Sequence, residues 1–423
     1  MEFSVFGKRF SRITGIGQLM EDLGEAIAGT REIRMLGGGN PAYIPEILGV
    51  LQERMRQLAA DPVMVRQLIA NYDPPRGNKK FIQALRDFFH QEYGWPIHTE
   101  NIVLTSGSQS AFFMLFNLFA GEFDDGSRRK ILVPLVPEYI GYTDVGLQED
   151  LFTAGRPEIE TFPDHSFKYH VPFHQLPMEQ PIGAICLSRP TNPTGNLISD
   201  ASIRQLLELA KTRQIPLIID NAYGLPFPNI LFREASLDWS EQIIHCFSLS
   251  KFGLPGVRTG IVIADPAITK ALTRMNGIMN LALGNLGPQL FTPLIRSGEA
   301  LRLGREVIMP YYRDKSRMAI EVLHRELAGI DYYLHKSEGA IFLWLWFPNL
   351  PITSEELYQR LKQRGVLVIS GHHFFPGLQG DWRHSHECLR VSYAMEEKTV
   401  REGIRIIADE VKQLYRRPQA GQP

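Results

Sequence analysis

The chain has 423 residues, of which 44% are hydrophobic and 22% are charged, as in ordinary globular proteins of two or three domains. The formal net charge of −1 gives no general attraction to nucleic acid, and no apolar stretch approaches the roughly 20 residues that a membrane-spanning helix needs. The amino terminus has no apolar core of a signal peptide, and three widely spaced cysteines indicate reduced thiols and a cytoplasmic protein.

The first hundred residues are predicted to be mainly helical. Amphipathic spacing predicts helices at 17–28 and 45–59, and a third around 81–89. Between the first two, Met35-Leu-Gly-Gly-Gly-Asn-Pro41 is either a plain turn or a loop whose backbone approaches a ligand closely.

From residue 101 to 264, short apolar stretches alternate with amphipathic ones. Strands are predicted at 101–105, 130–135, 182–187, 215–220, 243–247 and 259–264, with helices at 111–119 and 202–212. This alternation predicts an α/β fold with a large, doubly wound, mostly parallel sheet. Ligands bind such sheets outside the carboxyl ends of the strands, so the residues directly after each strand are candidates for a binding site.

After residue 265 the pattern changes to helices and then to a smaller α+β region. Helical segments are predicted at 267–296, 299–327, 354–363 and 397–416, and strands at 332–335, 340–346, 366–369 and 388–393. We expect three parts: an amino-terminal arm with part of the small domain (1–50), a large domain (51–300), and a carboxyl-terminal small domain that starts with a linking helix (301–423).

Lys251 follows the strand 243–247, in Ser248-Leu-Ser-Lys-Phe-Gly-Leu-Pro-Gly-Val-Arg258, which glycine and proline hold as a tight loop. A lone lysine in such a loop is usually a solvated surface residue. Here two hydroxyls, from Ser248 and Ser250, and the guanidinium of Arg258 accompany the amine. Together they suit a phosphate-bearing aldehyde, because the amine forms an imine while the other groups hold the phosphate. Pyridoxal phosphate is a cofactor with this chemistry.

Such a cofactor also needs a carboxylate for its pyridine nitrogen. Asp220 ends an apolar strand and is expected to be buried, where an unpaired carboxylate is costly. A protonated pyridine nitrogen is a suitable partner, and capping of a helix is the alternative. Tyr223, three residues later, and Asn192, in the loop after the strand 182–187, are candidates to bond the ring's oxygen.

Three further candidates each have a structural alternative. Ser106-Gly-Ser-Gln-Ser110 between a strand and a helix is an anion site or a simple helix cap. The two tyrosines of Pro137-Glu-Tyr-Ile-Gly-Tyr142 supply a ring face for a flat cofactor, or belong to the core. Arg390, in an alternating strand, faces inward and suits a substrate carboxylate if no acidic residue pairs with it.

With these residues in place, the chain resembles the fold-type I pyridoxal-phosphate aminotransferases of the aspartate aminotransferase superfamily. The matching motifs span nearly the whole chain in the family's order: Gly38-Gly-Asn-Pro41, Tyr72-x-x-Pro-x-Gly77, Gly107-Ser-Gln109, Asn192-Pro-Thr-Gly195, Asp220-x-x-Tyr223, Ser248-x-Ser-Lys251 with Arg258, and Arg390. Other stretches, such as Gly339-Ala-Ile-Phe-Leu-Trp-Leu-Trp-Phe347, are similar to the branch of this family that uses L-valine and pyruvate.

The resemblance implies a role for each of these residues. Lys251 carries the cofactor and moves the proton at the substrate's α-carbon, Asp220 pairs with the pyridine nitrogen, and Tyr139 stacks on the ring. Tyr72 reaches the phosphate of a neighbouring subunit, which implies a homodimer with shared sites. The remaining assignments are Asn192 and Tyr223 to the ring oxygen; Gly107, Ser108, Gln109, Ser248, Ser250 and Arg258 to the phosphate; and Arg390, Asn192 and the backbone near Gly39 to the substrate's α-carboxylate.

The reaction implied is a ping-pong transfer of the amino group of L-valine, or of a similar aliphatic amino acid, to pyruvate, which yields 3-methyl-2-oxobutanoate and L-alanine. An apolar pocket for the side chain is expected from Ile16, Tyr139 and the loop 372–376. Arg189 departs from the family pattern, and it is either a second contact for an anion or part of a surface ion pair. No metal is expected, because the spacing of His372, His373, His384, His386 and Cys388 matches no standard zinc pattern.

Three other classes of protein stay open at this point. A pyridoxal-phosphate lyase or synthase uses the same lysine and aspartate. A transcription regulator with an aminotransferase-like domain requires a basic DNA-binding domain, and none precedes residue 35. A cofactor-free structural protein requires that Lys251 be incidental.

Overall fold

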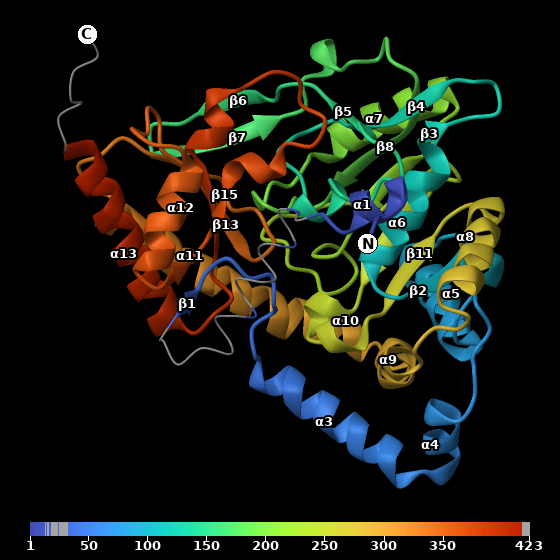
Figure 1. Cartoon of the computed structure of the whole chain (residues 1–423). Helices are drawn as coiled ribbons and strands as arrows, with labels where there is room; N and C mark the ends of the chain where they lie inside the picture. Colours follow the sequence, from blue (N-terminus) through green and yellow to red (C-terminus); the bar gives the residue numbers. More distant parts are fainter. Residues whose placement is uncertain (13, 15–16, 18–23, 25–32, 417–423) are drawn as a thin grey trace.

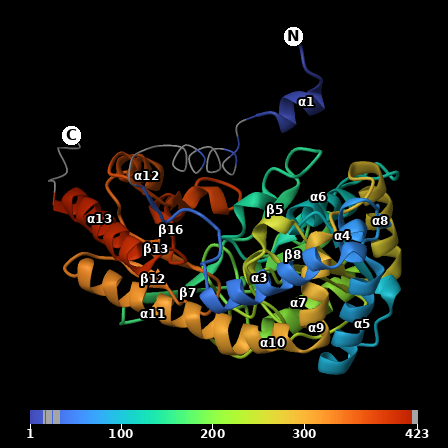
Figure 2. The same cartoon turned by 90° about the horizontal axis from the view of Figure 1, so that it is seen from below.

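The computed structural model describes residues 1–12, 14, 17, 24 and 33–416 of the chain. Figure 1 shows a body built on sheets, from which the helices α3 (Pro45–Ala60) and α4 (Pro62–Ile69) project as an arm. The short helix α1 (Val5–Phe10) lies on the outer side of this body (Figure 2). The helix predicted at 17–28 falls largely outside the described residues.

The first sheet has eight strands in the order β2-β11-β10-β9-β8-β4-β3, with β5 also paired to β4. The strands β10, β9, β8, β4 and β5 run parallel to one another, whereas β11 is antiparallel to both of its neighbours. The bounds are β2 (Ile102–Thr105), β3 (Gly121–Glu122), β4 (Arg128–Val133), β5 (Phe152–Ala154), β8 (Ile182–Ser188), β9 (Leu217–Asp220), β10 (Ile243–Ser248) and β11 (Gly260–Ile263). The predicted doubly wound, mostly parallel sheet is therefore confirmed.

Helices cover both faces of this sheet, which is why its central strands are mostly apolar. Phe112 and Leu115 of α6 (Ser108–Phe119) pack on one face. Leu206 and Ala210 of α7 (Asp200–Arg213) pack on the other. The helices α5 (Lys79–Tyr93), α8 (Pro266–Met279) and α9 (Leu286–Arg296) complete this part of the chain.

A second sheet has six strands in the order β15-β16-β13-β12-β7-β6. Its bounds are β6 (Glu158–Thr161), β7 (Ser166–His170), β12 (Tyr333–His335), β13 (Phe342–Trp346), β15 (Ile369–Ser370) and β16 (Cys388–Ser392). The strands β6 and β7 come from the middle of the chain and join the second sheet through β7, which runs parallel to β12. The division into domains at residues 50 and 300 therefore stays a prediction.

The short strand β1 (Arg34–Met35), near the amino terminus, pairs with β14 (Val366–Leu367), and the rest of the carboxyl-terminal region is mainly helical. The helix predicted at 299–327 consists of α10 (Glu299–Leu303), a π-helical turn (Gly304–Ile308) and α11 (Met309–Glu326). The helices α12 (Ser354–Gln363) and α13 (Glu397–Arg416) follow. Among the described residues, no helix combines the length and apolar content that crossing a membrane requires.

Replacement of Gly183 by alanine is expected to destabilise the first sheet. A Cβ atom at this position would lie 1.6 Å from the carbonyl oxygen of Phe119, the last residue of α6. Because the carbonyl belongs to the backbone, α6 must shift, and we expect a loss of about 3 kcal/mol in the free energy of unfolding. Gly49→Ala in α3, where nothing lies within 4 Å, is the control and is expected to be neutral or slightly stabilising. Equal thermal midpoints for the two variants would contradict this packing.

Candidate active site

A cavity of about 380 Å³ lies at the carboxyl ends of β8, β9 and β10 and reaches Arg390 of the second sheet. Most of the predicted site residues line it: Gly39, Ser108, Gln109, Tyr139, Asn192, Asp220, Tyr223, Ser248, Ser250, Lys251, Arg258 and Arg390. Gly107 borders it at the start of α6. The structure therefore brings together residues that lie up to 351 positions apart in the sequence, although their roles stay predictions.

Lys251 lies in a turn of 3₁₀-helix directly after β10, and its amine extends into the cavity. Its Nζ donates a hydrogen bond of 2.6 Å to the carbonyl oxygen of Gly39 and lies 5.4 Å from the ring centre of Tyr223. Burial lowers the pKa of Lys251 to about 8, and the positive charges of Arg390 and Arg258 act in the same direction. An amine of this kind is more readily deprotonated, and hence more nucleophilic near neutral pH, than a surface lysine.

Asp220 ends the central strand β9 and is only 6% exposed. Its Oδ2 accepts a hydrogen bond of 2.8 Å from the hydroxyl of Tyr142, and its Oδ1 accepts one of 2.9 Å from the backbone N–H of Ala222. Burial raises the pKa of Asp220 to about 6, although both hydrogen bonds and the charge of Lys251 oppose this shift. The carboxylate is thus held beside the cavity without a direct ion pair to any described residue.

The predicted phosphate-binding residues form a cradle where α6 begins. Arg258 has a left-handed backbone (φ 46°), and its Nη1 lies 3.4 Å from the hydroxyl of Ser250. A Cβ atom at Gly107 would lie 2.2 Å from Nη2 of Arg258, so this position must be glycine for the guanidinium to fit. The first backbone N–H groups of α6, from Ser108 onward, complete a site that favours an anion. The amide of Gln109 is turned to the carbonyl of Gly141 at 2.7 Å.

Arg390 reaches the opposite end of the cavity from β16. Its Nη1 donates to Oδ1 of Asn192 at 2.8 Å, and its Nη2 donates to the carbonyl oxygen of Gly37 at 2.7 Å. Its guanidinium carbon lies 4.0 Å from the ring centre of Phe342. The Nε atom is buried and has no hydrogen-bond partner in the described part of the chain. No acidic residue pairs with Arg390 there, which is the condition under which a substrate carboxylate was predicted.

The two tyrosines of the segment 137–142 have different environments. The ring of Tyr139 lines the cavity, in space that Gly141 leaves free, since a Cβ atom there would lie 2.4 Å from that ring. Tyr142 is fully buried and bonds Asp220. Sequence analysis treated both as possible ring faces and missed the Tyr142–Asp220 contact. The only sequence signal for this contact was a tyrosine a few residues after β4, the strand that pairs with β8.

Sequence analysis also missed Glu138, which is completely buried. Its Oε1 accepts from the backbone N–H of Ser188 at 2.6 Å, and its Oε2 accepts from the Ser188 hydroxyl at 2.7 Å and from the backbone N–H of Tyr139 at 3.0 Å. Burial raises the pKa of Glu138 to about 8, while these three donors oppose the shift. The sequence signal for this buried glutamate was a charged residue that stands between a proline and an aromatic residue after a strand.

Arg189 does not line the cavity. Its guanidinium pairs with Asp200 and donates at 2.9 Å to the carbonyl oxygens of Ile198 and Ser236. The sequence left two alternatives for Arg189, a second contact for an anion or a surface ion pair. The structure shows an ion pair, but the side chain of Arg189 is only 8% exposed and so does not lie on the surface.

His384 and His386 lie in a 3₁₀-helix before β16, whereas Cys388 is the first residue of that strand. His384 contacts the hydroxyl of Tyr169. His372, His373 and Glu355 place possible ligand atoms within 4.8 Å of one another. The expectation that no metal binds stays a prediction.

Comparison with known proteins now identifies the family. The family model "Aminotransferase class I and II" matches residues 51–407. The chain belongs to the class I and II aminotransferases. It is 48% identical over 415 residues to the valine–pyruvate aminotransferase of Escherichia coli, an alignment that covers 98% of this chain and 99% of that protein.

Two solved structures of aminotransferases have the same fold. The crystal structure of valine–pyruvate aminotransferase from Salmonella typhimurium superimposes with a TM-score of 0.88 at 47% identity, over 96% of this chain and all of that one (100%). That of an amino-acid aminotransferase from Psychrobacter arcticum superimposes with a TM-score of 0.96 at 45% identity, over 99% of this chain and 100% of that one. The resemblance inferred from sequence motifs is thereby confirmed.

Aminotransferases of this family use pyridoxal phosphate, and the cavity offers the groups that this cofactor requires. An amine with a lowered pKa, a buried carboxylate without a direct ion pair to any described residue, and an anion cradle lie around one space. The residues that would hold the cofactor are Lys251 for its aldehyde carbon, Asp220 for its ring nitrogen, and Arg258 with the start of α6 for its phosphate.

Covalent attachment of pyridoxal phosphate to cofactor-free protein is expected to accelerate as the pH rises through about 8. Only the unprotonated amine attacks the aldehyde, and the pKa of Lys251 is about 8, not the ordinary 10.5. Borohydride trapping followed by peptide mass spectrometry measures the rate at each pH. Arg390→Gln removes a positive charge that lowers this pKa, so its midpoint should move to higher pH. A midpoint near 10.5 in the unchanged protein would contradict the assigned environment of Lys251.

Proposed function

We propose that this protein transfers the amino group of L-valine, and of similar small aliphatic amino acids, to pyruvate. The observation that carries the proposal is the set of cations around the cavity. Among the described lining residues they are Lys251, Arg258 and Arg390. If Lys251 binds the aldehyde and Arg258 the phosphate, only Arg390 remains for the substrate. One guanidinium suits one carboxylate, as in valine and pyruvate, and the valine–pyruvate aminotransferases named above support this choice.

The residues act as follows in each half of the reaction. Arg390 and Asn192 bind the α-carboxylate and fix the α-carbon beside Lys251. Pyridoxal phosphate, when bound, supplies an electron sink for negative charge at that carbon. Lys251 removes the proton from the α-carbon of valine and later returns one to the α-carbon of the product alanine. Asp220, itself held by Tyr142, keeps a proton on the ring nitrogen.

The other contacts orient these groups. Tyr223 lies beside Lys251 and packs against Phe342 with ring centres 5.9 Å apart, so its hydroxyl has a fixed direction. Tyr139 would stack on the flat face of the cofactor. An apolar pocket for the substrate's side chain was expected from Ile16, Tyr139 and the loop 372–376. Ile16 lies outside the described residues. Phe374 of the loop has its ring centre 5.2 Å from the guanidinium carbon of Arg390.

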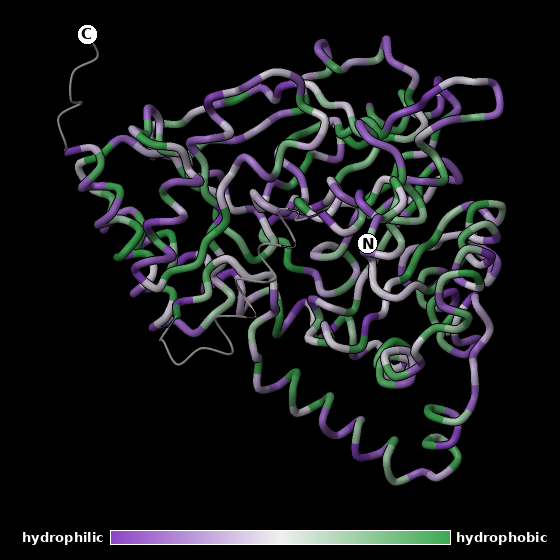
Figure 3. The backbone as a smooth tube through the Cα atoms, viewed as in Figure 1, coloured by the Kyte–Doolittle hydropathy of each residue, from purple (hydrophilic) through white to green (hydrophobic). Residues whose placement is uncertain are grey.

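We further propose that two copies of the chain form a homodimer with shared sites. Tyr72 is 83% exposed and is not among the described residues that line its own cavity, which supports a role in the partner's site. Large apolar side chains are also exposed on or beside the projecting arm and the end of α8, and Figure 3 shows hydrophobic segments along α4. They are Tyr43 (85%), Val63 (50%), Ile69 (77%), Ile278 (86%) and Leu281 (63%).

A cytoplasmic location is supported by the three cysteines, which are all buried and form no disulfide.

Steady-state kinetics tests the substrate pair. Reciprocal plots with L-valine and pyruvate should be parallel, with 3-methyl-2-oxobutanoate and L-alanine as products. L-Aspartate should react with a kcat/KM about a hundredfold lower, because its second carboxylate finds no free cation among the described lining residues. Preference for a dicarboxylic substrate would overturn the specificity and leave the family assignment intact.

Mixed dimers test whether sites are shared. Lys251→Ala and Tyr72→Ala are each expected to reduce activity strongly. When the two proteins are unfolded and refolded together, mixed dimers should regain activity, because one site then combines Lys251 of one chain with Tyr72 of the other. If each site used its own Tyr72, no mixture of the two variants would regain activity.

A further inference from the structure

The loop 188–197, which carries Asn192, is closed on itself at its tip. The N–H of Thr191 donates to the carbonyl of Asn196 at 2.9 Å, and the N–H of Gly195 donates to the carbonyl of Thr191 at 2.8 Å. This short ring fixes the shape of the loop but not its position relative to the two sheets. The position matters, because Oδ1 of Asn192 orients the guanidinium of Arg390.

One end of the loop is held by Glu138. The carboxylate accepts from both the N–H and the hydroxyl of Ser188, and that hydroxyl in turn accepts from the N–H of Asn192 at 3.3 Å. The same carboxylate accepts from the N–H of Tyr139. One fully buried group therefore joins the predicted ring-stacking residue to the residue that contacts Arg390.

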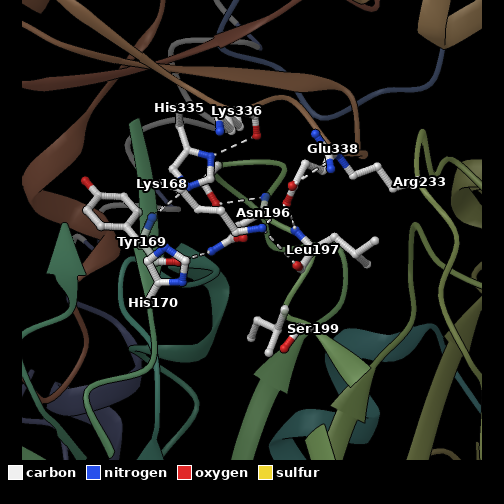
Figure 4. Close-up of polar contacts among 12 residues, drawn as sticks. Lys168, Tyr169, His170, Asn196, Leu197, Ser199, Arg233, His335, Lys336 and Glu338 are labelled. Carbon is white, nitrogen blue, oxygen red and sulfur yellow. Dashed lines mark hydrogen bonds and ion pairs between the residues drawn. The ribbon is translucent and has the colours of Figure 1, made fainter. Parts of the chain in front are cut away.

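The other end of the loop is held by Glu338, which is 4% exposed and lies between β12 and β13 (Figure 4). Its Oε2 accepts from the N–H of Leu197 at 3.0 Å and from the amine of Lys168, on β7, at 2.6 Å. Its backbone N–H donates to the carbonyl of Gly195 at 3.1 Å, and its Oε1 lies 3.3 Å from Nε of Arg233. The contacts fix the far end of the loop to the second sheet, which also carries Arg390 on β16.

We propose that Glu138 and Glu338 are positioning residues that clamp the two ends of the loop 188–197 and thereby hold Asn192 and Arg390 in register for the substrate's α-carboxylate. The inference rests on the proposed function only in taking this pair as the carboxylate site. Neither glutamate touches the cavity itself, since neither is among its lining residues. Their effect on the reaction is therefore indirect.

Replacement of Glu138 by glutamine tests the first clamp without a change of shape. The N–H groups of Ser188 and Tyr139 face different oxygens of the carboxylate. A glutamine has only one carbonyl oxygen, so in either orientation its NH₂ group opposes one of these N–H donors. A buried N–H then loses its partner, and the loop end must move.

Carboxylate binding is best measured with 3-methylbutanoate, which has the side chain and the carboxylate of valine but no amino group. Its inhibition constant should rise about tenfold in Glu138→Gln, or about 1.4 kcal/mol of binding free energy. In Glu338→Gln the inhibition constant should rise about threefold. The amide oxygen of the glutamine can still accept from the N–H of Leu197, but the negative charge that faces the amine of Lys168 is lost. The KM values of valine and pyruvate should rise by the same factor as each other, since both use one carboxylate site, with kcat and the visible band of the bound cofactor nearly unchanged.

Glu410→Gln is the matched control. Glu410 is a buried glutamate on α13 that pairs with Arg360 and Arg364, which lie in α12 and directly after it and not in the loop. It should leave the inhibition constant unchanged even if it lowers the thermal midpoint. If Glu138→Gln does not fold, Ser188→Ala removes the hydroxyl that donates to Glu138 and accepts from Asn192, keeps the backbone N–H of Ser188 on Glu138, and should raise the constant about threefold.

The variant Arg390→Lys distinguishes a failure of the proposed carboxylate site from a failure of the clamp. If it leaves the inhibition constant unchanged, the carboxylate site of the proposed function is wrong. If it raises the constant while Glu138→Gln, Glu338→Gln and Ser188→Ala behave like Glu410→Gln, the clamp is wrong and the site stands. A fall in kcat without a change in the KM values of the glutamate variants would likewise overturn the positioning role.

Discussion

The site depends on one constraint: a carboxylate enclosed at the end of the central strand must find a positive partner. Asp220 is buried and receives two hydrogen bonds, but it has no direct ion pair with a described residue. An isolated ionised group in such a place is unfavourable, and this is visible in its raised pKa. A protonated ring nitrogen satisfies the requirement. In the proposed function the same interaction would make the bound ring electron-withdrawing, so the carboxylate that is costly to bury would also support the chemistry.

The topology delivers the remaining groups to this carboxylate. The parallel run of β8, β9 and β10 places Asn192, Asp220 and Lys251 at one edge of the first sheet, each at or after the end of its own strand. The second sheet contributes Arg390 from β16. Lys251 and Arg390, which the proposed function assigns to the reaction and to the substrate's carboxylate, thus come from different sheets. On that assignment, contacts that keep the two sheets in register support the catalytic arrangement.

Sequence reasoning recovered the residues whose position follows from local pattern. Lys251, Asp220 and Arg390 each stand at the end of, or within, a recognisable strand, and parallel topology then brings them together. The Tyr142–Asp220 contact was not predicted. It joins residues 78 positions apart and depends on how far each of two strands extends along the sheet, which the local sequence does not indicate. The buried pairing of Arg189 was undetermined for the same reason.

The second sheet shows a different limit. The place of β6 and β7 in the second sheet could not be predicted from the sequence, although Phe167 and Tyr169 alternate inward with a period of two. Their partner β12 lies more than 160 residues later in the chain, so no local signal indicated which sheet they join. The buried Lys168–Glu338 pair, which brings this strand to the loop of Asn192, was hidden with them.

The most direct test of the account is a single half-reaction, carried out with purified, cofactor-loaded protein and L-valine in the absence of any oxo acid. The account predicts one equivalent of 3-methyl-2-oxobutanoate per intact Lys251 site, no free ammonia, and loss of the visible absorbance band until pyruvate restores it. Continuous release of ammonia would contradict amino transfer and indicate a lyase. A band that ignores valine but responds to another amino acid would contradict the substrate and leave the chemistry of Lys251 and Asp220 in place.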